Sequence, residues 1–444
     1  MEQPHVLFFM CDQMQYQRQG KIDPVAHTPN LDRLADDGTF FTHFHSANGQ
    51  CVPSRASMQT GLYPHEAEVM IIYGFHNHTA HLTGKQKTVG HVFQDAGYTT
   101  AYFGKTHFGT PLRELGYDVG AGGRKTRRPL STGDQEIVGT ALDFLEDYDA
   151  QKPLFLTVSV NMPHPPFEVV EGFADQYALE DMVIPRSFYE DDLSDKPQFL
   201  QDHMNDGNHG IFDEGELREE MRQYYTMISE VDRLFGEVRR VFEEKGMWDN
   251  TLALFTSDHG DMMGGHRMKK KGTIPYEEIF RVPFIVRLPG DEHKGQVADA
   301  LSVNVSLPGT LIEGVGLEVP ESFHGGSLMP VIRGQDRGPE EIYFEHYGAY
   351  WGIHPLRAVR TRDWKYVKYY GEDNTEELYH LSQDPDELRN LIGDSEAEPM
   401  RAKLEAMVDK WWDETGGKDA AYYESAEFKT RGGTIEEIQS RGVF

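Results

Sequence analysis

Reactive side chains follow four of the apolar runs in this sequence, at the points where strands would end. The runs and the segments after them are 6–10 with Cys11-Asp12-Gln13, 99–103 with Gly104-Lys105-Thr106-His107, 154–160 with Asn161-Met162-Pro163-His164, and 252–257 with Asp258-His259-Gly260-Asp261. In an open α/β sheet, ligands bind outside the carboxyl ends of the strands. If these strands are parallel neighbours, we expect one pocket to collect all four segments.

Asp12 and the pair Asp258-His259 carry side chains that bind divalent cations in proteins. Carboxylate oxygens suit calcium, magnesium and manganese, and imidazole nitrogen suits transition metals. Each of them alone also fits a structural role, because an Asp after a strand can cap a helix and an Asp-His pair can form a polar turn. Their joint occurrence favours a metal site.

Cys51 begins the most specific segment of the sequence, Cys51-Val52-Pro53-Ser54-Arg55-Ala56-Ser57-Met58-Gln59-Thr60-Gly61. A Pro near the start and a Gly at the end are typical of a helix, so we expect Cys51 at a helix N-terminus. The free amides and the dipole there favour negative charge, and Arg55, one turn along, is positioned to hold an oxyanion. A buried structural cysteine is the alternative for Cys51 by itself.

The same segment resembles the sulfatase signature, which is Cys-x-Pro-Ser-Arg with Thr-Gly five and six residues beyond the Arg. The resemblance extends from Val6 to about Leu391. It implies that a formylglycine-generating enzyme oxidises Cys51 to formylglycine, whose hydrated aldehyde is the nucleophile. One geminal hydroxyl would attack sulfur, and the other would expel sulfate by re-forming the aldehyde.

The resemblance also assigns Asp12, Asp258 and His259 to one divalent metal, together with the side chain derived from Cys51. The family often has a second Asp where this sequence has Gln13, and we retain Gln13 as a candidate ligand. The combination of Asp-Gln with Asp-His is similar to choline sulfatases and phosphonate monoester hydrolases as well, which leaves the metal and the substrate open. Calcium is our first choice, with manganese or magnesium as alternatives.

Three further segments resemble the family in the same order along the chain. Lys105 and His107 match its Gly-Lys-x-His segment, in which the Lys holds sulfate and the His contacts the formylglycine. His164 matches its Pro-His and would stabilise or protonate the leaving oxygen. One lysine after Asp258 should bind sulfate; the spacing favours Lys271 and leaves Lys270 open. Without the resemblance, a run of lysines indicates a solvated face.

The charge balance opposes whole classes of partner. Forty-three basic and seventy-three acidic side chains give a formal net charge of −30, which disfavours nucleic acid and anionic membranes. An anionic substrate therefore needs a locally positive pocket, which Arg55, Lys105 and one of the two lysines would provide. The two cysteines, Cys11 and Cys51, are weak evidence for a disulfide. Neither a signal peptide nor a membrane span is apparent, so we expect a cytoplasmic chain.

The order of elements needed to position these residues is that of an α/β protein. Apolar, β-rich runs at 6–10, 99–103, 154–160, 252–255 and 283–288 alternate with helical patterns at 28–37, 88–97, 136–148 and 216–246. From about residue 340 the pattern changes to short strands at 342–345, 357–360 and 364–369, then a helix at 399–412. We therefore predict a catalytic domain at 1–338 and a C-terminal α+β domain at 339–444.

Two segments do not fit this alternation. Residues 172–215 are acidic and weakly periodic, which indicates an extended surface insertion. The stretch from Gly416 is polar and interrupted by glycine, which favours an arm. For the whole chain, the resemblance implies an alkaline phosphatase-like fold, with a large mixed β-sheet flanked by helices and a four-stranded antiparallel sheet in the smaller C-terminal domain.

These observations predict a sulfatase that acts on a small anionic sulfate ester. A sulfated mono- or oligosaccharide is the first candidate substrate and a small alkyl or aryl sulfate the second. His76, His78 and His81 could contact the substrate body, with surface histidines as the alternative. The rival functions are a phosphonate monoester or phosphodiester hydrolase on the same scaffold, and a non-catalytic anion-binding protein in which Cys51 stays a thiol. A homo-oligomer is compatible with the sequence.

Overall fold

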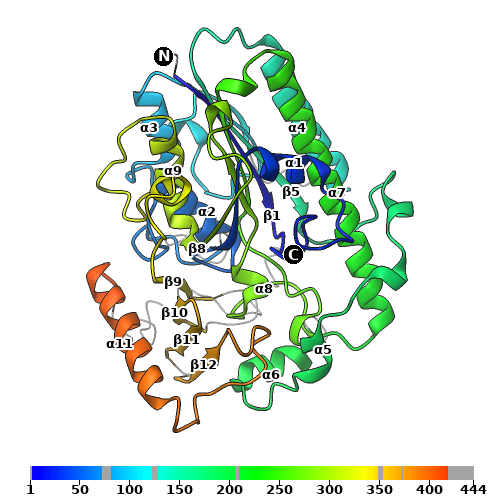
Figure 1. The fold of residues 1–444 in the computed structure, drawn as a ribbon, viewed down its shortest axis with the longest axis vertical. Coiled ribbons are helices and arrows are strands. Elements are labelled where there is room, and N and C mark those ends of the chain that lie inside the picture. The colour runs from blue at the N-terminus through cyan, green and yellow to red at the C-terminus, as the bar shows by residue number, and fades with distance from the viewer. Residues whose placement is uncertain are drawn as a thin grey trace.

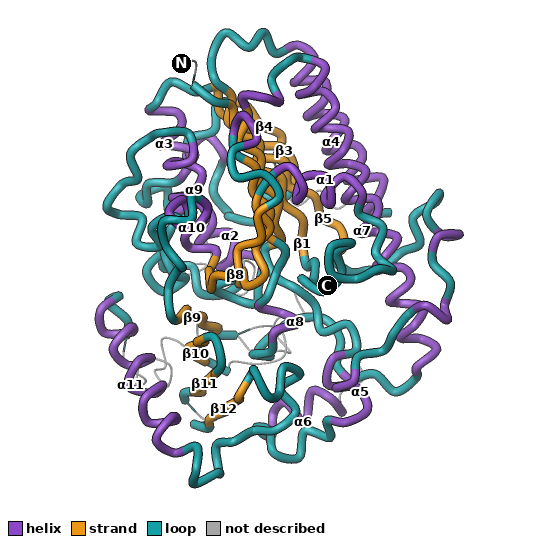
Figure 2. The backbone as a smooth tube through the Cα atoms, in the orientation of Figure 1, coloured by secondary structure: helices purple, strands orange, loops and turns teal. Residues whose placement is uncertain are grey.

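The computed structural model describes residues 3–72, 82–122, 129–205, 210–348, 354–371 and 374–418. These residues form an eight-stranded sheet and a four-stranded sheet. In the view of Figures 1 and 2, the large sheet lies in the upper part between helices and the small sheet lies below it. The expected combination of a large mixed sheet and a small antiparallel sheet is confirmed.

The large sheet has the strand order β4-β3-β5-β1-β6-β7-β2-β8. Its strands are β1 (His5–Asp12), β2 (Thr39–His45), β3 (Thr99–Gly104), β4 (Val119–Gly122), β5 (Leu154–Pro163), β6 (Thr251–Ser257), β7 (Phe284–Arg287) and β8 (Gln296–Val303). Strand β7 is antiparallel to both of its neighbours, and the other pairs are parallel. The four strands that lead into reactive segments, β3, β5, β1 and β6, are consecutive and parallel, as expected.

Strand β1 shows why an unbroken apolar run forms the middle of this sheet. All of its residues are buried, and successive side chains point to opposite faces. Leu7 and Phe9 belong to one hydrophobic cluster, and Val6 and Phe8 belong to the other. A strand covered on both faces needs apolar residues at every position. Each such side chain contributes about 1.5–3 kcal/mol by burial.

Helices cover both faces of the large sheet (Figure 1). One cluster includes residues of α1 (Pro29–Asp37), α4 (Leu130–Asp147) and α7 (Glu214–Glu244). The other includes residues of α2 (Cys51–Thr60), α3 (Val89–Asp95), α9 (Leu307–Gly314) and α10 (Met329–Ile332). The predicted helix at 136–148 begins earlier, at Leu130. Helix α7 begins after Asp213, whose carboxylate accepts a hydrogen bond from the Glu216 amide at 2.8 Å.

The small sheet has the order β12-β11-β10-β9 and is antiparallel throughout. Its strands are β9 (Glu341–His346), β10 (Leu356–Thr361), β11 (Trp364–Tyr369) and β12 (Glu376–His380). Apolar residues of α11 (Glu398–Glu414) pack on one face of this sheet. The other face packs with α6 (Gln198–Asn205) and α8 (Glu277–Phe280). The division of the chain at residue 338 stays a prediction.

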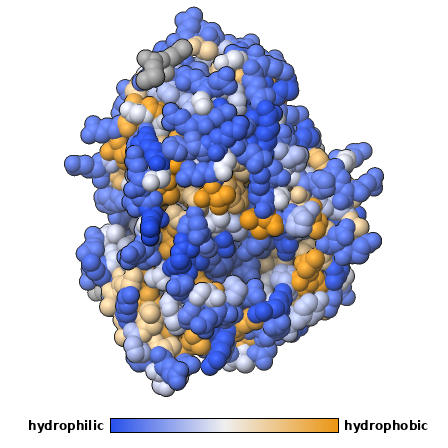
Figure 3. Space-filling model, viewed as in Figure 1, coloured by the Kyte–Doolittle hydropathy of each residue, from blue (hydrophilic) through white to orange (hydrophobic). Residues whose placement is uncertain are grey.

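The described residues of the acidic stretch at 172–215 include short helices, among them α5 (Arg186–Glu190) and α6. Val183 and Tyr189 in this stretch are more than half exposed. The face drawn in Figure 3 is dominated by hydrophilic residues. Among the described residues, none of the helices has both the length and the apolar character needed to cross a membrane. Most of the predicted C-terminal arm lies outside the described residues.

Candidate active site and metal centre

The carboxyl ends of β1 and β6 bring the predicted metal ligands together. Cys11 lies opposite Ser257 in the parallel pairing of the two strands, so the next residues, Asp12 and Asp258, emerge side by side. Asp12, Cys51, Asp258 and His259 each offer a ligand atom, and these atoms all lie within 4.8 Å of one another. All four residues are buried. The sequence analysis expected Asp12 and Asp258-His259 to lie close together at the strand ends, and the structure brings them together with Cys51.

This cluster fits a divalent cation in its chemistry. His259 Nδ1 is 2.8 Å from the Gly260 carbonyl and must donate to it, so Nε2 keeps its lone pair and faces Asp12 Oδ1 at 3.4 Å. Burial and the Lys271 cation lower the pKa of His259 to about 3, which keeps the ring neutral as a ligand must be. In the described part of the chain, Gln13 Oε1 is buried without a hydrogen-bond partner. Two carboxylates, a neutral imidazole and an amide oxygen suit a divalent ion.

Cys51 is the first residue of α2, which ends at Gly61 with a left-handed φ of 67°. The expected position at a helix N-terminus is therefore observed, and the helix begins at Cys51 itself rather than at the following Pro. Cys51 Sγ lies 3.3 Å from His259 Nε2 and 3.7 Å from Asp12 Oδ1. The side chain of residue 51 thus lies beside the candidate metal ligands.

Arg55 is fully buried, and its guanidinium group donates hydrogen bonds to groups next to the candidate metal ligands. Its Nε donates to Asp258 Oδ2 at 2.7 Å, and its Nη1 donates to the Lys105 carbonyl at 3.0 Å and to Ser159 Oγ at 2.8 Å. Burial alone would raise the pKa of Asp258, but Arg55 and the neighbouring cations hold it below its usual range. Arg55 therefore fixes an ionised ligand in place, a contact that the sequence did not predict.

Two lysines reach the site from different segments. Lys105 forms an ion pair with Asp12 Oδ2. Lys271 is 4% exposed, and its Nζ lies 2.9 Å from Cys51 Sγ and 3.0 Å from His259 Nε2. Lys270 is instead only half-buried, and its backbone amide donates to Asp261 Oδ1 at 3.1 Å. Of the two adjacent lysines, the structure therefore brings Lys271 to Cys51.

Of the remaining candidate histidines, the structure describes His164 and His107. His164 is part-buried, and its Nδ1 contacts the Pro165 carbonyl at 2.5 Å. Burial and the cations Lys271 and Lys105 lower the pKa of His164 well below its usual value. His107 follows β3 with a positive φ of 59° and is half-buried. The histidines at 76, 78 and 81 lie outside the described residues.

Sequence reasoning assigned no role to Asp261, although it follows β6 in the segment singled out there. Asp261 is fully buried, and its Oδ2 accepts a hydrogen bond from the Gln13 side-chain amide. Tyr224 of α7 was also missed; its hydroxyl donates to the Gln13 carbonyl at 2.6 Å. The position of Asp261 at a strand end was the one available indication, and Tyr224 offered none.

Comparisons with known proteins match the region of the chain that contains these residues. A family model described as Sulfatase matches residues 4–317, which include Asp12, Cys51 and Asp258. A second model, described as N-sulphoglucosamine sulphohydrolase, C-terminal, matches residues 264–414. The first match alone covers more than half of the chain and contains every candidate residue of the site.

Individual relatives match almost the whole chain. It is 25% identical over 506 residues to an N-acetylglucosamine-6-O-sulfatase of Bacteroides thetaiotaomicron, covering 96% of this chain and 89% of the relative. It is 26% identical over 455 residues to an ulvan-active sulfatase of Formosa agariphila, covering 95% and 83%. Among solved structures, a phosphonate monoester hydrolase of Agrobacterium radiobacter has a TM-score of 0.79 at 23% identity, covering 93% and 96%. That likeness supports the expected alkaline phosphatase-like fold.

Proposed function

The chain belongs to the sulfatase family, whose members are sulfuric ester hydrolases, and on this premise we propose that it cleaves a sulfate ester with a formylglycine made from Cys51 and one divalent metal. One observation carries the proposal: Cys51 Sγ lies among Asp12, Asp258 and His259 and is 2.9 Å from Lys271 Nζ. A buried thiol with no chemical role would not need this combination of ligands and cation.

The residues around Cys51 would prepare it for attack on sulfur. The hydrated aldehyde would supply one hydroxyl that attacks and a second that re-forms the aldehyde and releases sulfate. The metal, when bound, would polarise the attacking hydroxyl and offset charge on the sulfate oxygens. Asp12, Asp258, His259 and Gln13 would hold the metal, and Arg55 would keep Asp258 ionised and oriented. The protein thus presents ligands whose geometry exists before substrate binds.

Lys271 and Lys105 would bind the sulfate group, since both cations lie in a buried site and Lys271 Nζ is beside the nucleophile position. His164 would act on the leaving oxygen. Without substrate, burial and then the cations Lys271 and Lys105 hold the pKa of His164 low, so its ring is neutral. An anionic sulfate between these groups would offset the lysine charges and raise the His164 pKa, so that His164 would donate a proton to the ester oxygen as it leaves. His107 would contact the formylglycine from the end of β3.

We propose a sulfated mono- or oligosaccharide as the substrate class, ahead of a small alkyl or aryl sulfate. The N-acetylglucosamine-6-O-sulfatase relative supports this order. A phosphonate monoester is the rival, because a tetrahedral anion of similar size meets the same cations and because Gln13 stands where the family often has Asp. We propose calcium as the metal, since three of the four protein ligands are oxygens.

The test is co-expression with a formylglycine-generating enzyme, followed by peptide mass analysis across Cys51 and turnover of a chromogenic aryl sulfate. We expect an aldehyde at Cys51 and metal-dependent turnover that falls by about 10⁴-fold or more in Cys51→Ala. Cys11→Ala is the matched control, because Cys11 is equally buried and burial raises the pKa of its thiol. An unmodified, inactive Cys51 thiol would contradict the proposal, and faster turnover of a phosphonate monoester would favour the rival substrate.

A further inference from the structure

The side-chain amide of Gln13 is held by one contact and leaves one atom unused. Its Nε2 donates to Asp261 Oδ2, and its Oε1 has no hydrogen-bond partner among the described residues. Gln13 is completely buried. A buried amide oxygen without a partner costs about 1–3 kcal/mol, so it points to a ligand that is absent from the protein itself.

The backbone of Gln13 cannot move to relieve this. Its amide donates to Asp258 Oδ1 at 3.1 Å, and its carbonyl accepts from the Tyr224 hydroxyl at 2.6 Å. Its φ of 74° lies in the left-handed region, which a glutamine adopts only where its surroundings fix it. Gln13 is therefore anchored between Asp12, its neighbour in the chain, and Asp258, so only the orientation of its amide is left to be set.

Asp261 sets that orientation, because one of its two oxygens is already occupied. Its Oδ1 accepts hydrogen bonds from the backbone amides of Met263 at 2.8 Å and Lys270 at 3.1 Å. Only Oδ2 is directed to Gln13, and a carboxylate oxygen accepts and does not donate. The NH₂ group of Gln13 must therefore turn to Asp261, which leaves Oε1 as the free atom.

We propose that Asp261 is a positioning residue that fixes the Gln13 amide so that Oε1 is offered to the divalent cation of the Asp12, Asp258 and His259 cluster. The proposal rests on the metal site of the proposed function. A cation accepts the lone pair of an amide oxygen and is repelled by the protons of an NH₂ group. The orientation of one amide therefore decides whether Gln13 is a ligand or an obstacle.

Asp261→Asn tests this by an amide flip. The backbone amides of Met263 and Lys270 require an acceptor, so the new Asn places its oxygen there and directs its NH₂ group to Gln13. Gln13 must then accept this hydrogen bond with its Oε1, which turns its own NH₂ group toward the metal ligands. We expect the affinity for Ca²⁺, measured by titration calorimetry on the unmodified thiol form, to fall about 10- to 100-fold.

A second substitution restores an oxygen atom that faces the metal, while position 261 stays Asn. In Gln13→Glu combined with Asp261→Asn, one carboxylate oxygen accepts from the Asn and the other faces the metal. We expect this double variant to recover Ca²⁺ affinity to within about threefold of wild type, which repair of folding alone would not explain. Asp291→Asn, at the far end of the sheet, is the matched control and should bind Ca²⁺ as wild type does.

The outcomes separate this inference from the proposed function. Unchanged affinity in Asp261→Asn, or a double variant as weak as the single one, would overturn the role of Asp261 while leaving the sulfatase proposal intact. No Ca²⁺ or Mn²⁺ binding by wild type would overturn both the role of Asp261 and the proposed metal. If the Ca²⁺ affinities follow the expected pattern but the matured protein hydrolyses no sulfate ester, the role of Asp261 is supported. Only the proposed function is then contradicted.

Discussion

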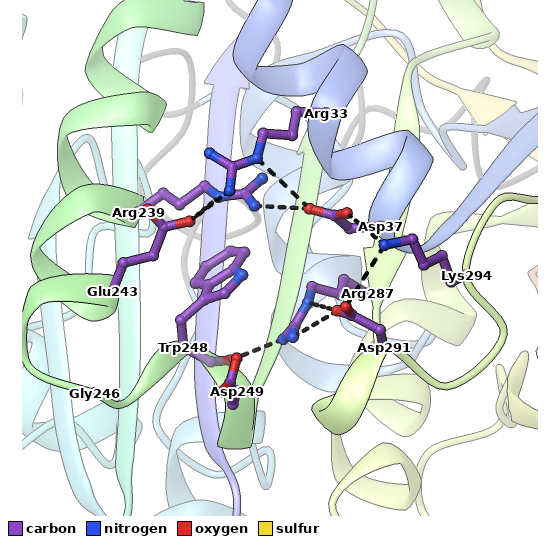
Figure 4. A pocket seen from close by; sticks show the side chains of 10 residues that line it. All are labelled: Arg33, Asp37, Arg239, Glu243, Gly246, Trp248, Asp249, Arg287, Asp291 and Lys294. Atoms are coloured by element: carbon purple, nitrogen blue, oxygen red, sulfur yellow. Dashed lines mark hydrogen bonds and ion pairs between the residues drawn. The ribbon is translucent and has the colours of Figure 1, made fainter.

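Two clusters of charged side chains lie at opposite ends of strand β6, and they differ in what stands next to their cations. At its amino end, charged side chains and Trp248 line a cavity of about 340 Å³ (Figure 4). At its carboxyl end stands the candidate active site with Asp258 and Cys51. Seven residues of strand separate the two, a span of about 23 Å.

The cations of the cluster at the amino end are paired with carboxylates, although Arg239 Nη1 is buried without a hydrogen-bond partner among the described residues. Arg239 Nη2 and Asp37 Oδ2 are 2.7 Å apart, and Arg287 donates to the carbonyls of Trp248 and Thr251 at 2.8 and 2.9 Å. Both guanidinium groups also lie over the Trp248 ring, at 4.6 and 4.9 Å. The ion pairs of this cavity join Arg33, Arg239, Arg287 and Lys294 to Asp37, Glu243 and Asp291. Each of these cations has a carboxylate partner, which is a structural role.

The cluster at the carboxyl end is incomplete. Lys271 Nζ lies nearest to a thiol and an imidazole, and its distance to Asp12 Oδ1 is 4.0 Å. Gln13 Oε1 has no hydrogen-bond partner among the described residues. A cluster of charges is therefore a poor indicator of function by itself. What distinguishes the carboxyl end is a cation that lies beside a thiol and an imidazole, among side chains able to bind a metal, whereas the cations of the amino end lie beside carboxylates.

The largest contrast should come from removing one lysine at each end. Lys271→Ala takes a cation from beside the nucleophile position, so kcat/KM for an aryl sulfate should fall about 10²- to 10³-fold. Lys294→Ala removes a half-exposed partner of Asp37 and Asp291, and should leave kcat/KM within about twofold and stability within about 0.5 kcal/mol. Comparable losses of activity in the two variants would erase the distinction.

Metal removal should affect stability only through the carboxyl end. Ca²⁺ at about 100 times its Kd should raise the free energy of unfolding by about 2.7 kcal/mol relative to chelator, because it binds the folded state alone. Asp12→Asn should lose most of this gain. Asp37→Asn breaks ion pairs at the amino end and should lower stability in chelator while keeping the full gain on adding Ca²⁺. Urea unfolding with and without metal measures both, and a full gain in Asp12→Asn would refute the assignment of Asp12 as a ligand.

The sequence was most informative where one residue or one run suffices for the conclusion. Continuous apolar runs predicted β1, β3, β5 and β6, because strands buried on both faces need them. Strands β2 and β8 were missed, since polar residues interrupt both, as in Thr39–His45. The antiparallel direction of β7 was also beyond reach, because a strand of four residues carries no mark of its direction.

Partner assignments within the site could not be read from the sequence. Gln13 and Asp261 are 248 residues apart, and their hydrogen bond exists only because β1 pairs with β6. Spacing favoured Lys271 and left Lys270 open. In the structure Lys270 has a left-handed φ of 71° and bonds Asp261 through its backbone, while Lys271 reaches Cys51. Irregular segments of this kind have no periodicity from which side-chain direction can be inferred.

The smallest expected effect is the pH dependence of stability. It should come from a buried histidine next to the site and not from the ion pairs at the amino end. His346 of β9 is completely buried and contacts Thr273, two residues after Lys271. Burial, with a smaller contribution from His354, lowers its pKa to about 3. Below about pH 6.5 the unfolded chain binds this proton and the folded chain does not. His346 should therefore contribute a fall of about 2 kcal/mol to the free energy of unfolding as the pH is lowered from 6.5 to about 5.

The amino-end pairs should not contribute to that slope. Burial raises the pKa of Asp37, but Arg239 and Lys294 outweigh it and hold the pKa below its usual value, so this carboxylate stays ionised until the pH falls below about 4. Urea unfolding in chelator across this pH range should give a flatter profile for His346→Gln than for wild type. Asp37→Asn should lower stability by a constant amount with an unchanged slope, because the Asp37 carboxylate stays ionised throughout the window. A profile that Asp37→Asn flattens and His346→Gln leaves intact would reverse the roles of the two ends.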